Sequence, residues 1–270
     1  FMTPTGDSSL LLWAMAAVVV LLATHLFVAW IRRAQGNEGW RQNVGPVLVA
    51  GSALGLGMSS AMVLALAAEA LPFALGYRWI MLPALVLLPP LLCLLPAWWL
   101  VKRQNWLALL GAGLLLTLVA LAVQVGWILA AGLRPGIRWN FPLLGAAGAL
   151  QLLGFVASLW LAYSDASSDG ARKTLWRVGA AALFTVTLLT GQEVVVGAIG
   201  LHGQVGSIYQ REASATWLCL VAGALVPTLM AVMSLDVFLR NSGERHRSRR
   251  GAVELNMPKR RKRRRKYRAL

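Results

Sequence analysis

The sequence has 270 residues, of which 58% are apolar and only 13% are charged. A soluble domain of this size is charged at about a quarter of its positions, so this composition excludes an ordinary water-soluble globular fold. Thirteen of the 26 basic residues lie between Arg245 and Arg268, with one acid among them, so this segment carries +12 of the net charge of +16. The high net charge therefore describes a C-terminal tail and not the body of the chain.

Seven apolar stretches in the body are each long enough to cross a bilayer, which takes about 20 residues in a helix. They are Leu10–Ile31, Pro46–Ala70, Trp79–Val101, Trp106–Ala131, Phe141–Tyr163, Trp176–Gly200 and Ala215–Leu239. Because the connections are short, we predict one all-α polytopic membrane bundle of seven transmembrane helices over residues 1–240. A basic tail over residues 241–270 follows it.

Basic residues are divided unevenly between the two sets of connecting segments. The richer set, which follows the first, third and fifth stretches, carries Arg32, Arg33, Arg41, Lys102, Arg103, Arg172, Lys173 and Arg177. The poorer set carries Arg78, Arg134, Arg138 and Arg211. Lys and Arg are enriched in cytoplasmic loops, so we predict an outside N-terminus and a cytoplasmic tail.

Tryptophans and small residues refine this bundle. Eleven tryptophans fall near predicted span ends, where indole rings prefer the headgroup level: Trp13, Trp30, Trp79, Trp98, Trp99, Trp106, Trp127, Trp139, Trp160, Trp176 and Trp217. Small residues recur every four positions in the second stretch (Gly51, Gly55, Ser59) and in the fifth (Gly154, Ser158). This spacing predicts close helix packing.

The second stretch and its exit carry a recognisable motif. Residues Gly55–Trp79 read GLGMSSAMVLALAAEALPFALGYRW, a glycine-rich helix followed by an LP-x-x-x-GY exit. This segment resembles the first repeat of the MHYT domain, a bacterial seven-span sensor module. Residues Leu10–Gly36 are similar to that family's first helix, and Phe155–Gly197 to its fifth and sixth. The resemblance implies the same seven-helix scaffold, in a bacterial inner membrane.

The MHYT family is proposed to bind copper through Met and His residues and to sense oxygen, carbon monoxide or nitric oxide. Copper favours such thioether and imidazole ligands. The positions that match the family's ligands hold Ala61, Met62 and Leu66 in the second stretch, Ala122, Val123 and Trp127 in the fourth, and Gln192 or Glu193 in the sixth. Only Met62 is a soft ligand, so the resemblance implies a degenerate scaffold without a bound metal or other cofactor.

Four polar or soft side chains remain at a similar depth in the predicted helices, namely Met62, Gln124, Gln192 and Glu193. Ionisable residues inside a membrane are costly and usually face the bundle interior. We therefore predict a buried polar cluster that holds the helices together, with Glu193 as a neutral carboxyl that donates to an amide. A proton relay or a small-ligand site is the alternative.

The tail contains eight consecutive basic residues, Lys259, Arg260, Arg261, Lys262, Arg263, Arg264, Arg265 and Lys266. Beside a last helix, such a run binds anionic lipid headgroups. Other interpretations are binding to RNA or to an acidic cytoplasmic surface, and a solvated segment that only sets topology.

The sequence does not favour an enzyme, because it contains no nucleophile–base pair, phosphate loop or HExxH motif. We predict a non-catalytic accessory or structural subunit that binds other membrane proteins in a larger bacterial complex. The alternatives are a sensor or regulatory protein that signals to a separate partner, and a small transporter.

The predicted topology can be tested with reporter fusions. A reporter fused after Leu270 should report the cytoplasm, and one inserted at Gly203 should report the periplasm, because an odd number of spans lies before the tail. The same side for both would contradict either the seven spans or their direction.

Overall fold

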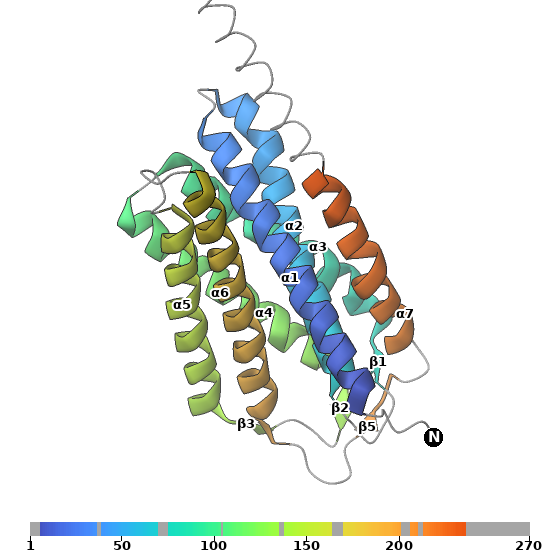
Figure 1. Cartoon of the computed structure of the whole chain (residues 1–270). Helices are drawn as coiled ribbons and strands as arrows, with labels where there is room; N and C mark the ends of the chain where they lie inside the picture. The colour runs from blue at the N-terminus through green and yellow to red at the C-terminus, as the bar shows by residue number, and fades with distance from the viewer. Residues whose placement is uncertain are drawn as a thin grey trace, which may run out of the picture. The chain divides into compact units, whose positions relative to one another are not determined.

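The computed structural model describes residues 6–36, 39–69, 75–103, 105–134, 138–163, 170–200, 206–209 and 213–235. Within them, seven helices are long and apolar enough to cross a membrane (Figure 1). The predicted all-α, multi-pass bundle is therefore confirmed, while its direction stays a prediction. The chain divides into a compact unit, Phe1–Met233, and a second unit, Ser234–Leu270. The basic tail lies outside the described residues.

The helices are α1 (Gly6–Gln35), α2 (Trp40–Ala68), α3 (Leu82–Lys102), α4 (Trp106–Ala130), α5 (Phe141–Tyr163), α6 (Gly170–Gly197) and α7, which begins as Ala215–Leu220. A 3-10 turn, Trp79–Met81, precedes α3, and α7 passes through a π-helical turn, Val221–Leu225. The seventh span continues to Leu235. Helix α2 begins before Pro46, the predicted start, because the polar residues ahead of it extend the helix beyond the apolar stretch.

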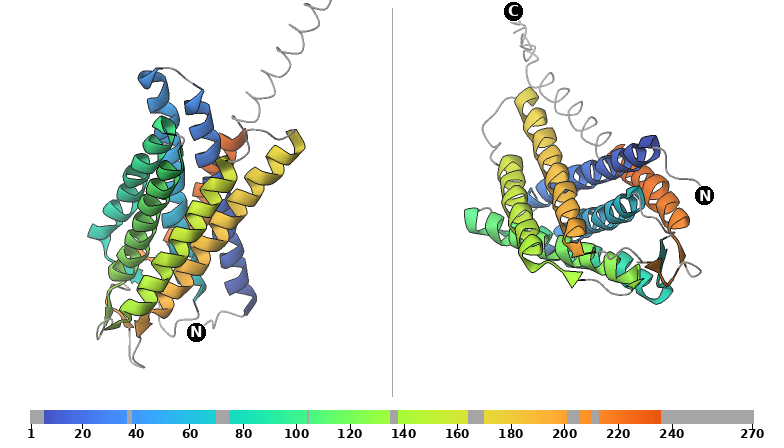
Figure 2. Two further views of the ribbon diagram at one scale, coloured as in Figure 1. Left: turned by 90° about the vertical axis from the view of Figure 1, so that its left-hand side faces the viewer. Right: turned by 90° about the horizontal axis from the view of Figure 1, so that it is seen from below.

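The first six helices form a closed ring. Each contacts the next in sequence, and α6 returns to pack on α1, while α7 packs on α2 and α1 (Figures 1 and 2). Helix α2 is the most enclosed. Of the residues in its most apolar 18-residue stretch, 78% are buried, against 11% in the corresponding stretch of α7. The bundle is therefore organised around α2.

The small residues of α2 allow this enclosure. A Cβ atom on Gly55 would overlap the backbone of Pro89 and Pro90 in α3. Pro89 has no N–H, so the carbonyl of Leu85 lacks its usual partner within the helix. The Ser59 hydroxyl of α2 donates to that carbonyl at 2.9 Å. The predicted small-residue stripe thus faces α3 and supplies the hydrogen bond that proline removes.

Helices α5 and α6 repeat the same arrangement. A Cβ atom on Gly154 would overlap the Thr187 side chain of α6. The Ser158 hydroxyl donates to the Ala180 carbonyl at 2.7 Å. The rings of Phe155 and Phe184 stack between these helices, with centroids 4.3 Å apart. The second predicted stripe therefore also marks a helix contact.

At one end of the bundle, here called the basic end, α1 caps its neighbours. The Arg32 guanidinium donates to the carbonyl of Ala162 near the end of α5. Gln35 Nε2 donates to the Leu100 carbonyl of α3 at 2.9 Å. Carbonyls in the last turn of a helix have no partner inside it, and a cation there also interacts favourably with the negative end of the helix dipole. Both residues therefore fix helix ends, and Arg32 also contributes positive charge.

The opposite end, here called the strand end, carries three short antiparallel sheets that the sequence did not predict. They pair β1 (Gly76–Tyr77) with β6 (Ala213–Ser214), β2 (Leu133–Arg134) with β5 (Gly206–Ser207), and β3 (Arg138–Trp139) with β4 (Ile199–Gly200). The Ser207 hydroxyl lies 2.8 Å from the Ala131 carbonyl and 3.0 Å from that of Gly76. The connection between α6 and α7 therefore ties the exits of α2 and α4 together.

The α2–α3 contact can be tested by two substitutions. Gly55→Ala should lower the free energy of unfolding in detergent by about 1–3 kcal/mol, because backbone atoms of α3 must shift. Ser59→Ala should lower the free energy of unfolding by about 0.6 kcal/mol and at most about 1.7 kcal/mol, the average and the maximum for hydrogen bonds between membrane helices. Gly45→Ala is the matched control, since nothing lies within 4 Å of a Cβ atom there. Equal stability of the Gly55 and Gly45 variants would contradict the close approach.

Candidate functional site

Of the residues predicted to form one polar cluster, Gln124 and Gln192 are buried inside the bundle, where they make hydrogen bonds to different partners. Gln151 Nε2 of α5 donates to Gln124 Oε1 of α4 at 3.1 Å, and both side chains are buried. Gly191 of α6 makes room for this pair, because a Cβ atom there would overlap the Gln151 side chain. Sequence reasoning missed Gln151, although a lone amide in an apolar stretch is itself a signal.

Gln192 makes a separate connection. Its side chain is buried, and Nε2 lies 3.5 Å from the Ala61 carbonyl of α2, to which it donates. Met62, the next residue of α2, is also fully buried and belongs to the apolar core. Gln192 therefore links α6 to α2, and Met62 contributes packing.

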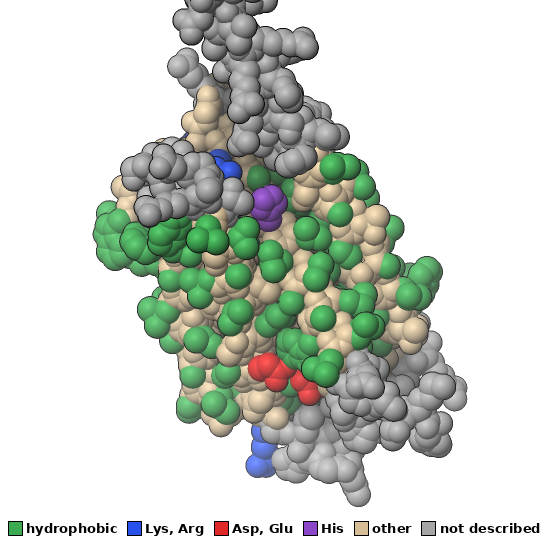
Figure 3. Space-filling view, in the orientation of Figure 1, with side chains coloured by type: hydrophobic (Ala, Val, Ile, Leu, Met, Phe, Trp, Pro, Cys, Tyr) green, Lys and Arg blue, Asp and Glu red, His purple; other side chains and the backbone are tan. Residues whose placement is uncertain are grey.

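The prediction that Glu193 is buried among these amides is wrong. Successive residues of a helix point about 100° apart, so burial of Gln192 turns Glu193 away from the interior. Glu193 is exposed, and its carboxyl group lies within hydrogen-bonding reach of the Glu69 carboxyl at the end of α2. The acidic side chains form one patch toward the strand end in Figure 3. The pair is therefore a surface feature.

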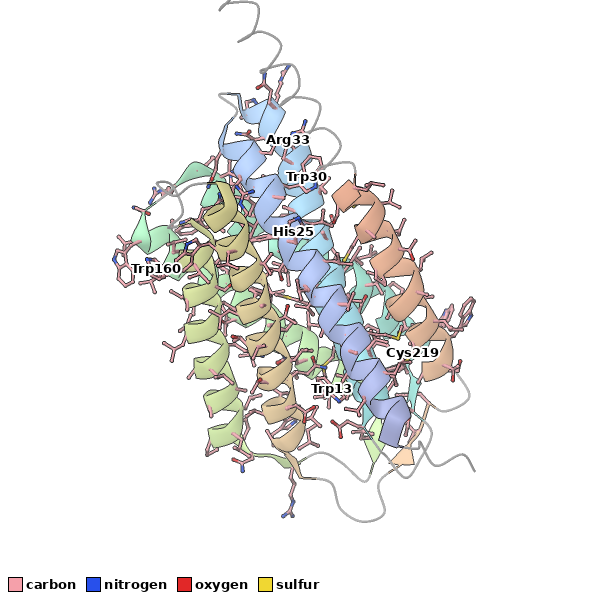
Figure 4. All side chains as sticks on the ribbon, in the orientation of Figure 1. Trp13, His25, Trp30, Arg33, Trp160 and Cys219 are labelled. Atoms are coloured by element: carbon pink, nitrogen blue, oxygen red, sulfur yellow. The ribbon has the colours of Figure 1, made fainter. Side chains whose placement is uncertain are left out.

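Trp127 also departs from its predicted place at the membrane interface. It is 1% exposed, and its ring meets the buried Tyr77 ring edge-on, with centroids 5.3 Å apart. Burial raises the pKa of the Tyr77 hydroxyl, and the Cys219 thiol adds to the shift. Tyr77 is therefore neutral at physiological pH. Of the other labelled tryptophans, Trp30 and Trp160 lie toward the basic end of the bundle and Trp13 lies toward the strand end (Figure 4).

Several buried polar atoms of these residues have no hydrogen-bond partner, namely Gln124 Nε2, Gln151 Oε1, Trp127 Nε1 and the Tyr77 hydroxyl. Such atoms are costly in an apolar interior, and bound water is the usual partner. They include donors and an acceptor but no anionic or thiolate group. Within the described ranges, no three His, Cys, Asp or Glu side chains are grouped as metal ligands. The chemistry available at these positions is hydrogen bonding.

The contact between Glu69 and Glu193 can be tested by cross-linking. With Cys93 and Cys219 replaced by Ala, the variant Glu69→Cys/Glu193→Cys should react with a short bifunctional thiol reagent to join α2 to α6 within one chain. The matched control is Glu69→Cys/Arg177→Cys, because Arg177 lies about 24 Å from Glu193 along α6. Protease cleavage between α2 and α6, followed by electrophoresis, detects the link. Equal cross-linking of both variants would contradict the contact.

Comparison of the chain with known protein families, curated proteins and solved structures gives no match. The resemblance to the MHYT domain therefore stays a prediction. What the structure establishes is a multi-pass membrane bundle whose interior amides connect its helices.

Proposed function

We propose that this chain is a non-catalytic subunit of a larger assembly in the bacterial inner membrane, on a degenerate MHYT-like scaffold. The observation that carries the proposal is a run of exposed small residues on the strand-end half of α5, Gly145, Ala146 and Ala149. Exposed small residues let the backbone of another helix approach closely. This face suits a partner's transmembrane helix.

Helix α5 also exposes large side chains, such as Leu153, but its exposed small residues are grouped in one run, which the exposed surfaces of α3 and α7 do not show. Those two surfaces carry large aliphatic side chains, such as Leu87, Leu91, Leu225 and Leu229, each more than half exposed. Lipid tails cover such side chains without any need for close backbone approach. On α5, by contrast, nothing lies within 4 Å of a Cβ atom on Gly145, while the neighbouring Gly148 faces Leu121 of α4. The contrast supports a protein partner at α5.

A recess at the start of α5 adjoins this face. It has a volume of about 480 Å³ and combines polar and aromatic groups. Its lining residues are Arg138, Trp139, Asn140, Phe141, Pro142, Gly197 and Ala198. A loop that follows the partner's helix out of the membrane would meet this recess. In this proposal the basic tail, residues 259–266, provides a second contact, with anionic lipid or an acidic surface of the complex.

A second candidate is a sensor or regulatory protein, and the Glu69–Glu193 pair favours it. A hydrogen bond between two carboxyl groups requires one proton between them. Gain or loss of that proton would make or break a contact between the ends of α2 and α6. Such a pair is suited to coupling proton concentration to helix position.

The subunit proposal can be tested by photo-cross-linking in native membranes. A photoreactive phenylalanine analogue at Ala149 should give a discrete adduct heavier than the chain, and Gly145→Leu should abolish most of it by blocking close approach. The same analogue at Ala224, an exposed small residue of α7, is the control and should give no discrete adduct. An adduct of twice the chain mass would indicate self-association. That result, or no discrete adduct at Ala149, would contradict a partner subunit at α5.

A further inference from the structure

A groove at the basic end lies between α3 and α4, away from the amides and from the α5 face. It has a volume of about 420 Å³ and is lined by Leu95, Trp98, Trp99, Lys102, Arg103 and Leu115. Gly111 of α4 borders it, because a Cβ atom there would lie 3.5 Å from the Trp99 indole ring. The missing side chain lets the ring lie against α4. The groove is therefore apolar along its length and basic at its mouth.

The two cations occupy the mouth in an ordered way. Lys102 Nζ lies 4.9 Å from the centroid of the Trp98 ring, a cation–π distance that holds the ammonium group beside the groove. The Arg103 N–H donates to the Trp99 carbonyl at 3.0 Å, which fixes the backbone where α3 ends. Both side chains are exposed, and none of the lining residues is acidic. The mouth therefore presents two positive charges without a neutralising partner among the lining residues.

We propose that this groove binds one anionic phospholipid, with its phosphate at Lys102 and Arg103 and an acyl chain along Leu95, Trp99 and Leu115. The third span ends at Lys102, so both cations stand at the depth of the lipid headgroups. A soluble anion would use the cations but not the apolar wall. In the predicted orientation the site faces the cytoplasmic leaflet, which is negatively charged.

Two neighbouring features at the same end help to define the specificity. A second groove, between α4 and α5, has a volume of about 400 Å³ and is lined by apolar residues that include Trp106 and Trp160. It has no cation in its lining, so it accepts acyl chains without selecting a headgroup. Arg33 lies 5.0 Å from the Trp30 ring of α1, which reproduces the cation–aromatic pair outside the proposed site. Of these three features, the α3–α4 groove alone joins both halves of a lipid site.

The experiment must report on the groove itself, because the basic tail attracts anionic lipid as well. Full-length protein in mild detergent is labelled with phosphatidylglycerol that carries a photoreactive diazirine in one acyl chain. Mass spectrometry of the peptides then locates the label. We expect labelling in the segments that contain Leu95–Trp99 and Leu115. Unlabelled phosphatidylglycerol should compete well, phosphatidylcholine poorly, and inorganic phosphate not at all.

Substitutions separate the headgroup from the chain. Lys102→Gln and Arg103→Gln should each reduce groove labelling about fivefold, since a basic residue at an anionic surface contributes about 1 kcal/mol. Arg33→Gln is the matched control and should leave groove labelling unchanged. Leu95→Trp should fill the groove and reduce labelling while both charges remain.

Three outcomes would overturn the proposal. The first is equal competition by phosphatidylcholine, which would make the groove a non-selective lipid contact. The second is equal loss of groove labelling in the Arg33 and Lys102 variants, which would indicate a general effect of surface charge. The third is full competition by inorganic phosphate, which would identify an anion site without an acyl chain. Because α5 takes no part, failure here leaves the proposed subunit role untouched.

Discussion

The contact on which the bundle depends is the approach of α2 to the proline-containing part of α3. Lipid offers no hydrogen bonds, so a carbonyl released by proline must find a protein partner. Ser59 supplies that partner, and it reaches Leu85 only because Gly55 lets the two backbones meet. Held there, α2 becomes the most enclosed of the six helices that form the ring. A larger residue at position 55 would therefore break the Ser59–Leu85 hydrogen bond and the packing of α2 on α3 at the same time.

Polar side chains inside the bundle serve mainly as connectors between helices. Gln124 and Gln151 join α4 to α5, Gln192 joins α6 to α2, and Ser158 joins α5 to α6. Each bond is made between different helices, and each is compatible with tight apolar packing around it. This arrangement suits a scaffold that holds its shape while other molecules bind at the two proposed outer sites, the α5 face and the groove between α3 and α4.

The sequence allowed the spans and their small-residue contacts to be predicted, because apolar length and four-residue spacing are local properties. The partners of individual residues were not predictable in the same way. Glu193 was expected to be buried like Gln192, yet one step along the helix turns its side chain to the surface. Trp127 lies near the end of α4, but it is buried against Tyr77, which comes from the connection between α2 and α3. The short strands were missed because two-residue strands leave no periodic pattern, and their register depends on residues that are far apart in sequence.

The strand end also constrains the order in which the molecule is completed during synthesis. Strands β1, β2 and β3 belong to the loops after α2 and α4, but every partner strand lies between α6 and α7. The ribosome makes the first three strands long before their partners exist. Ser207, which reaches both earlier loops, also comes late. In a nascent chain with five inserted helices, strands β1, β2 and β3 therefore have no partners yet. They can pair only after the sixth helix has crossed the membrane.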